Sequence, residues 1–277
     1  MKRILTVQDI SCVGKCSLTV ALPVISASGV ECSVLPTAVL STHTAFPEFT
    51  FRDLTDEIEP IGAVFSRLGI DFDAVYTGYL GSKRQVALVA ELIRRQKERG
   101  AYILIDPAMA DNGSLYPGFT AEFPPLMADM CRMADLVVPN VTEAALMLGM
   151  PYREKYDEKY IRELLSGLVS LGARSAAISG VSFSDDKIGF MHLDGESGEY
   201  TLYLNEKLPK SYHGTGDLFA SVTLGGVMRS LGEVRALELA TDVTLDAMKH
   251  TARDKSARFY GVNFEEALPL LISRLSE

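Results

Sequence analysis

The sequence has 277 residues, of which 47% are hydrophobic, and a formal net charge of −9. This length suits one large domain or two small ones, and the share of apolar residues is enough for a sizeable core. The negative charge argues against nucleic acid or an anionic membrane surface as a partner, and no apolar run reaches the ~18 residues that cross a bilayer.

The N-terminus and the cysteines favour a cytoplasmic protein. The opening MKRILTVQDI is basic and then apolar, but the apolar run stops at Gln8 and Asp9, which favours a first strand over a signal peptide. The four cysteines form no CxxC pair and no cluster with histidine. We therefore expect reduced thiols, with neither disulfides nor a zinc site.

Short apolar strands alternate with helices along most of the chain. The pattern predicts strands at 2–7, 31–40, 73–78, 101–107, 134–140 and 175–180. It predicts helices at 16–29, 55–69 with Thr55 as the cap, 82–100, 120–133, 141–149 and 157–171. Continuous apolar strands separated by helices are typical of a mainly parallel central sheet with helices on both faces. We therefore expect an α/β fold.

The pattern changes in the last third of the chain. Two alternating runs flank Asp194-Gly195, which predicts an antiparallel hairpin within 187–208. Helices are then predicted at about 214–231, at 233–250 and near 264–275. Because no repeat, linker or low-complexity segment interrupts the chain, we expect residues 1–277 to form a single domain.

Polar residues follow most of the predicted strands. In parallel α/β sheets, ligands bind outside the carboxyl ends of the strands. The polar residues at these positions are Gln8, Asp9, Ser11, Thr77, Tyr79, Asp106, Asn140, Glu143, Ser179 and Asp217. Each is weak evidence alone, because strand ends need turn residues, but together they predict a site at one edge of the sheet.

The segment SYHGTGDLFA at 211–220 places two glycines and an acid at the start of an apolar helix. A helix N-terminus presents unpaired N–H groups and the positive end of a dipole, which suits an anion. Either Asp217 caps this helix, or the N–H groups hold a phosphate while Asp217 accepts a proton.

Other common catalytic motifs are absent from the sequence. It contains no GxxxxGK[ST], no GxGxxG after the first strand, no GxSxG and no HExxH. What remains is an anion-binding loop, an acid beside it and carboxylates at neighbouring strand ends. Phosphoryl transfer requires these parts, since it needs donors for the phosphate, oxygen ligands near Mg²⁺ and a base for the attacking hydroxyl.

These motifs resemble those of the ribokinase superfamily, and most closely its pyridoxal/pyridoxamine kinase branch. The matching segments occur in the family's order: SCVG at 11–14, LSTHTAF at 40–46, TGY at 77–79, DPAMADNGSLY at 106–116, VPNVTEAALMLG at 138–149 and GTGDLFAS at 214–221. They span nearly the whole chain. GTGD marks only the superfamily, whereas the combination of STHTAF, TGY and PNxxEA is much more specific.

The resemblance implies a ribokinase-like fold and an ATP-dependent phosphorylation of the 5′-hydroxymethyl group of pyridoxal, pyridoxamine or pyridoxine. Asp217 would be the catalytic base, in contact with the substrate, and the amides of Gly214, Thr215 and Gly216 would form the anion hole. The residues that would hold the pyridine ring are Ser11, His43, Thr44 and Tyr79.

The resemblance also implies a nucleotide and metal site. The residues that would bind ATP, beside the anion hole, are Asp106, Asn140, Glu143 and Ser179. Mg²⁺ would lie near Asp106, Asp111 and Glu143, and many members of the family also bind a monovalent cation such as K⁺. The family further suggests a homodimer.

Three features depart from the family pattern. The turn after Ser11 is shorter than in the better-known pyridoxal kinases, which leaves the vitamer open. Ala110 replaces a usual glycine. Val138 stands where many members have a hydroxyl residue near the monovalent cation, which leaves potassium dependence open.

Ordinary structural roles stay open for several of these residues. Asn140 and Glu143 have the spacing of a capping box, and Asp106 precedes a proline as turn-forming residues do. His43 and Thr44 also suit a solvent-facing loop, Ser11 a turn and Tyr79 core packing. Lys15 is either a phosphate contact or a surface charge.

Three other functions fit the sequence less well. The first alternative is a hydroxymethylpyrimidine (phosphate) kinase of thiamine biosynthesis, whose substrate has a similar ring and alcohol. A sugar kinase of the same superfamily is less favoured, because the N-terminal region lacks the polar residues of a sugar site. The alternative of a different class is a non-catalytic, vitamer-binding protein with the same fold.

Overall fold

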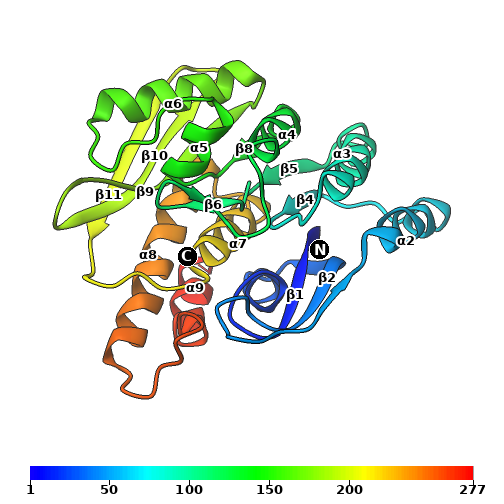
Figure 1. Ribbon diagram of the computed structural model, residues 1–277, viewed down its shortest axis with the longest axis horizontal. Coiled ribbons are helices and arrows are strands. Elements are labelled where there is room, and N and C mark those ends of the chain that lie inside the picture. The colour runs from blue at the N-terminus through cyan, green and yellow to red at the C-terminus, as the bar shows by residue number, and fades with distance from the viewer. Residues whose placement is uncertain (277) are drawn as a thin grey trace. The chain divides into compact units, whose positions relative to one another are not determined.

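The computed structural model describes residues 1–276, which form two compact units (Figure 1). Unit 1 comprises Met1–Gly78 and Leu208–Glu277, and unit 2 comprises Tyr79–Lys207. Unit 1 is therefore assembled from the two ends of the chain. The single domain expected over 1–277 stays a prediction.

The sheet of unit 1 has the strand order β4-β1-β2-β3. β1 (Arg3–Val13) pairs in parallel with β2 (Glu31–Thr42) and with β4 (Ala74–Thr77), and β3 (Phe51–Asp53) adds an antiparallel edge. β1 is longer than the predicted strand at 2–7, because its pairing with β2 continues as far as Val13. Asp9 and Ser11 consequently lie within the strand, not after it.

The helices of unit 1 lie near their predicted positions. They are α1 (Leu18–Ala27), α2 (Thr55–Arg67), α7 (Thr215–Met228), α8 (Glu233–Arg253), the 3₁₀ turn η1 (Phe264–Glu266) and α9 (Leu268–Arg274). The prediction that Thr55 caps α2 was wrong, because Thr55 is the first helical residue and its N–H donates to Asp53 Oδ1. α7 packs against both α1 and α8.

The main sheet of unit 2 has the strand order β11-β10-β9-β8-β5. β5 (Tyr102–Ile105), β8 (Leu136–Val137) and the first part of β9 (Ser175–Ser184) are parallel. β9, β10 (Lys187–Asp194) and β11 (Tyr200–Glu206) form an antiparallel meander, which confirms the predicted hairpin. β9 is longer than predicted because it continues alongside β10.

Four helices complete unit 2. They are α3 (Lys83–Lys97), α4 (Phe123–Cys131), α5 (Val141–Met147) and α6 (Glu158–Leu171). α6 packs on β9 and β10 through its buried side, which includes Leu164 and Leu168, and Figure 1 shows it lying along these strands. Within residues 1–276, no helix combines the length and apolar character that crossing a membrane requires.

A small hairpin of β6 (Ala110–Asp111) and β7 (Ser114–Leu115) was not predicted. Its two turn residues, Asn112 and Gly113, both have positive φ angles. Asn-Gly is the strongest short sequence signal for such a turn. The hairpin matters for function, because it carries Asp111.

Candidate active site

The segment 214–217 forms the start of α7. Gly214 directly precedes the helix and has a φ of 78°, a left-handed conformation that favours glycine. A side chain at this position would collide with the carbonyl oxygen of Lys15. The glycine therefore has no side chain to compete for the first N–H groups of the helix, which suits them to bind an anion.

Asp217 lies in the first turn of α7, two residues after Thr215 begins the helix. Burial raises the pKa of its carboxyl to about 6, against the effect of a hydrogen bond from the backbone N–H of Ser17, and the neighbouring Asp9 carboxylate raises it further. A carboxylate with a pKa near 6 is mostly ionised at neutral pH and is still basic enough to accept a proton.

A second carboxylate, that of Asp9 on β1, belongs to the same part of unit 1. Its Oδ1 accepts a hydrogen bond of 2.6 Å from Ser17 Oγ, and its Oδ2 accepts a longer one of 3.4 Å from Ser11 Oγ. The side chain is almost fully buried, and burial raises the pKa of its carboxyl. Asp9 was among the polar residues expected after the first strand but was given no role, and Ser17 was not predicted.

Ser11 and His43 both lie close to Gly14. A Cβ atom on Gly14 would be 3.1 Å from the Cβ of His43 and 3.2 Å from the Cβ of Ser11. Both side chains are buried at the ends of β1 and β2. The structure thus brings together two of the residues predicted to hold the substrate ring.

His43 has a second imidazole beside it. Its ring centroid is 4.9 Å from that of His213, and both burial and this neighbour lower the pKa of His43. The backbone N–H of Ala45 donates to His43 Nδ1, so the neutral ring carries its proton on Nε2. His213 was not predicted, although it directly precedes the GTGD motif.

The other two predicted ring contacts, Thr44 and Tyr79, are less buried than Ser11 and His43. Thr44 is exposed in the turn that follows β2. Tyr79, the first residue of unit 2, is half-buried, with its ring centroid 5.4 Å from that of Phe119. The exposure of Thr44 agrees with the solvent-facing alternative, whereas the packing of Tyr79 agrees with a core role.

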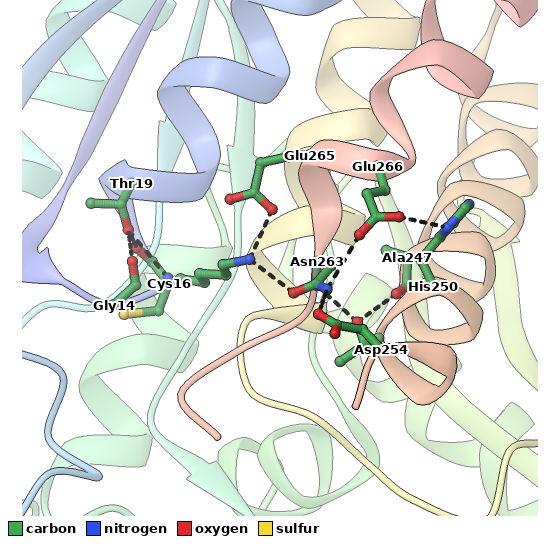
Figure 2. Close-up of polar contacts among 11 residues, drawn as sticks. Gly14, Cys16, Thr19, Ala247, His250, Asp254, Asn263, Glu265 and Glu266 are labelled. Carbon is green, nitrogen blue, oxygen red and sulfur yellow. Dashed lines mark hydrogen bonds and ion pairs between the residues drawn. The ribbon is translucent and has the colours of Figure 1, made fainter. Parts of the chain in front are cut away.

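Lys15 is held by the C-terminal part of unit 1. Its ammonium group lies 2.8 Å from Glu265 Oε2 and 3.1 Å from Asn263 Oδ1. Figure 2 shows Asn263 continuing this cluster to Asp254, to which its amide donates a hydrogen bond of 3.0 Å. Lys15 therefore anchors the segment before α9, a role that neither sequence alternative foresaw.

In unit 2, Asn140 and Glu143 form the capping box of α5. The Asn140 side chain accepts from the Glu143 N–H, and Glu143 Oε2 accepts from the Asn140 N–H, both at 2.9 Å. Glu143 Oε1 also accepts from the N–H groups of Met109 at 3.0 Å and Ala110 at 3.4 Å. Glu143 therefore joins the start of α5 to the segment that follows β5.

Three carboxylates are neighbours in this part of unit 2. Burial raises the pKa of Glu143 to about 7, the three N–H groups lower it, and the Asp111 carboxylate raises it. Glu143 and Asp106 both raise the pKa of the buried Cys131 thiol, so both carboxylates lie in the neighbourhood of that thiol. Asp106 is buried after β5, whereas Asp111 is exposed on the β6–β7 hairpin.

These carboxylates do not form a closed metal site. Among the side chains of residues 1–276, no three His, Cys, Asp or Glu gather as a metal-binding group. Mg²⁺ nevertheless prefers oxygen ligands and is commonly bound by one or two carboxylates, waters and substrate phosphates. The residues present therefore fit a metal that arrives with a nucleotide.

Ser179 lies beside Asn140, where β9 continues the parallel pairing past the end of β8. The two residues form an isolated parallel bridge, and the Ser179 N–H donates to the carbonyl of Pro139 at 2.9 Å. The Asn140 side chain donates to the carbonyl of Ala110 at 2.8 Å. Four of the residues predicted to bind ATP, Asp106, Asn140, Glu143 and Ser179, are thus grouped in unit 2.

Comparisons with known proteins give a consistent picture. The model of the phosphomethylpyrimidine kinase family matches residues 24–259. A Bacteroides thetaiotaomicron protein described as a phosphomethylpyrimidine kinase, with a crystal form that contains pyridoxal, is 36% identical, with a TM-score of 0.92 over 98% of this chain and 95% of that one. Pyridoxal kinase from Lactobacillus plantarum is 30% identical, with a TM-score of 0.90 over 99% of this chain and 98% of that one. A pyridoxal kinase of Actinobacillus pleuropneumoniae is 27% identical over 91% of this chain and 90% of its own length.

Proposed function

Because the chain belongs to the phosphomethylpyrimidine kinase family and, within the ribokinase-like superfamily, to its pyridoxal kinase branch, we propose that it phosphorylates the 5′-hydroxymethyl group of a B6 vitamer with ATP. The protein is a kinase. The observation that carries the proposed chemistry is the position of Asp217, a carboxylate with a pKa near 6 in the first turn of a helix that begins at a glycine loop.

The proposed reaction is an in-line transfer. The hydroxymethyl oxygen attacks the γ-phosphorus, its proton passes to the Asp217 carboxylate, and the bond from phosphorus to the β–γ bridging oxygen breaks, leaving ADP. The N–H groups of Gly214, Thr215 and Gly216 would donate to the oxygens of the transferring phosphoryl group. The vitamer phosphate and ADP then leave, and Asp217 returns its proton to water.

The ring of the vitamer would be oriented by neutral hydrogen bonds. Ser11 has a hydroxyl that can donate or accept, and His43 offers an N–H donor on Nε2. Thr44 and Tyr79 complete the proposed set. The pyridoxal found with the Bacteroides protein supports a pyridine substrate for this chain.

Asp106, Asn140, Glu143 and Ser179 would bind ATP, and Mg²⁺ would lie near Asp106 and Asp111. Mg²⁺ bound with ATP neutralises charge on the phosphate oxygens. Glu143 already accepts three backbone N–H groups, so we assign it to holding the segment after β5 and to contacts through water. A monovalent cation such as K⁺ is tested by comparing rates in potassium and tetramethylammonium salts.

One assay separates this function from its alternatives. ADP release is measured with ATP, Mg²⁺ and, in turn, pyridoxal, pyridoxamine, pyridoxine, hydroxymethylpyrimidine and ribose. The proposal predicts turnover with at least one B6 vitamer at a higher kcat/KM than with hydroxymethylpyrimidine. Binding of a vitamer without any ADP release would identify a non-catalytic binding protein.

The catalytic assignment has its own test. Asp217→Asn keeps the shape of the side chain but loses the basic carboxylate, so kcat should fall by about 10²–10⁴-fold. Nucleotide binding should survive, as measured by a nucleotide titration. A variant that retains near-normal kcat would exclude Asp217 as the base.

We also propose that the protein is a cytoplasmic homodimer. Unit 1 exposes three large apolar side chains: Val13 at the end of β1, Phe49 just before the edge strand β3, and Phe51 within it. Size-exclusion chromatography with light scattering tests the dimer, and fractionation of the native cells tests the compartment.

A further inference from the structure

Ser17 does not follow the usual pattern of a helix cap. A serine at this position normally has an extended backbone, and its Oγ accepts from an N–H of the first turn. Ser17 precedes α1 with a φ of 49° and a ψ of −131°, makes no side-chain cap, and donates its hydroxyl to Asp9 at 2.6 Å. A non-glycine residue with positive φ persists only when its surroundings hold it there.

Asp9 is placed to hold Ser17 in this conformation. It lies where the pairing of β1 with β2 shifts register, since Gln8 pairs with Pro36 but Ile10 pairs with Val39. Such irregularities redirect side chains and are frequent beside active sites. The carboxylate is 6% exposed, and the nearest lysine in the sequence, Lys15, binds Glu265 instead.

The strained backbone of Ser17 bears on the base, because the turn at residues 15–17 packs against the start of α7: a Cβ atom on Gly214 would collide with the Lys15 carbonyl and lie 3.9 Å from the backbone nitrogen of Cys16. The backbone of Ser17 also lowers the pKa of Asp217. We propose that Asp9 is a positioning residue for phosphoryl transfer, which holds Ser17 so that its N–H orients Asp217 and which places a negative charge beside that base. This inference rests on the proposed function, since it takes Asp217 as the base.

The negative charge of Asp9 makes the Asp217 carboxylate more basic, as its proposed role as a base requires. Its carboxylate raises the pKa of Asp217, in addition to the larger effect of burial. Other ionisable groups in this region are the thiol of Cys16, whose pKa both carboxylates raise, and the paired imidazoles of His43 and His213 beside Ser11. α1 has no ionisable side chain, and the buried residues of α8, which also packs on α7, are uncharged. Asp9 is therefore a charged neighbour that adds to the effect of burial on the pKa of Asp217.

Three variants separate the effect of the Asp9 charge from the effect of its hydrogen bond to Ser17. Asp9→Asn can still accept from Ser17 Oγ but has no charge, so the acid limb of the kcat/KM profile should move to lower pH. Asp9→Ala and Ser17→Ala break the hydrogen bond, so kcat should fall several-fold with little change in the vitamer KM. Asp73→Asn is the matched control, because Asp73 also accepts from a backbone N–H, that of Arg3, at the opposite end of β1. It should change neither the acid limb of the kcat/KM profile nor kcat.

The decisive measurement repeats Asp9→Ala in the Asp217→Asn background, with thermal melts for every variant. If Asp9 acts through Asp217, its removal has no further effect on kcat once the base is gone. The proposal is overturned if Asp9→Ala lowers kcat by the same factor in both backgrounds, or if Asp9→Asn leaves the acid limb in place. A raised vitamer KM with unchanged kcat would make Asp9 a substrate contact instead. Failure of the proposed function is distinguishable, because Asp217→Asn alone would then retain its activity.

Discussion

The carbonyl oxygen of Lys15 occupies the space that a side chain on Gly214 would need. Gly261 also approaches Lys15 closely, since a Cβ atom there would collide with the Lys15 side chain. The turn before α1 is thus packed between the start of the proposed anion hole and the C-terminal segment of unit 1. Small displacements of this turn should therefore also move the proposed anion hole at Gly214, Thr215 and Gly216.

Gly214→Ala should therefore cost both stability and activity. The new methyl group meets the Lys15 carbonyl, and the positive φ adds strain on the order of 1–3 kcal/mol. We expect a melting temperature several degrees lower and a large loss of kcat. Gly216→Ala is the matched control, because a Cβ there has open space and ordinary helical geometry. Equal melting temperatures for the two variants would contradict this account.

The Asp217 carboxyl should make the folded protein less stable as pH rises. Its pKa is about 6 in the folded protein and near 3.8 in the unfolded chain, so the folded state binds the proton more tightly between these values. Stability contributed by the protonated form is present below about pH 4 and is lost by about pH 6.

Asp217→Asn removes this titration. Its melting temperature relative to the wild type should therefore be higher at about pH 7 than at about pH 4. A helix-capping acid would produce the opposite trend, since its charge would stabilise the helix N-terminus above its pKa. Melts of the two proteins across this range decide between the base and the cap.

If Lys15 anchors the C-terminal segment, removing either partner of the Lys15–Glu265 ion pair should lower stability to a similar extent. Lys15→Met and Glu265→Gln should each lower the stability of unit 1 by no more than about 1 kcal/mol, because this ion pair is partly exposed. The double variant should lose less than the sum of the two, and the KM for ATP should stay constant. A rise in that KM for Lys15→Met alone would show that Lys15 contacts phosphate.

Glu143→Gln tests the nucleotide side of the site. A glutamine places an NH₂ group where the carboxylate accepted backbone N–H groups, which should cost about 1–3 kcal/mol. If Glu143 also holds the metal-bearing segment, the Mg²⁺ concentration for half-maximal rate should rise. Asp157→Ala is the control, since Asp157 caps α6 through the Tyr160 N–H and should lower the melting temperature without changing the Mg²⁺ requirement.

Periodicity and turn residues predicted the α/β class, the order of the elements and the late hairpin, and the family comparisons confirm the fold and the pyridoxal kinase branch. The lengths of β1 and β9 were underestimated, because pairing with a neighbour extends a strand beyond its apolar run. The β6–β7 hairpin was missed although Asn112-Gly113 was visible in the sequence.

Sequence motifs made Asp217 and His43 predictable as candidate site residues, with roles that stay predictions. The contacts of Asp9 and Ser17 were not, because they depend on a register shift and on a backbone conformation that no spacing reveals. Lys15 shows the same limit, since its partners lie at the other end of the chain. The assigned roles of these residues stay predictions until the variants are measured.

The assembly of unit 1 from both chain ends has a consequence for biosynthesis. Asp9 leaves the ribosome early, but α7, which carries Asp217, follows only after the whole of Tyr79–Lys207. At typical elongation rates this interval is on the order of 10 s. During that time α1 lacks α7, against which it packs in the finished protein, so nascent chains arrested before α7 should be sensitive to proteases and prone to bind chaperones.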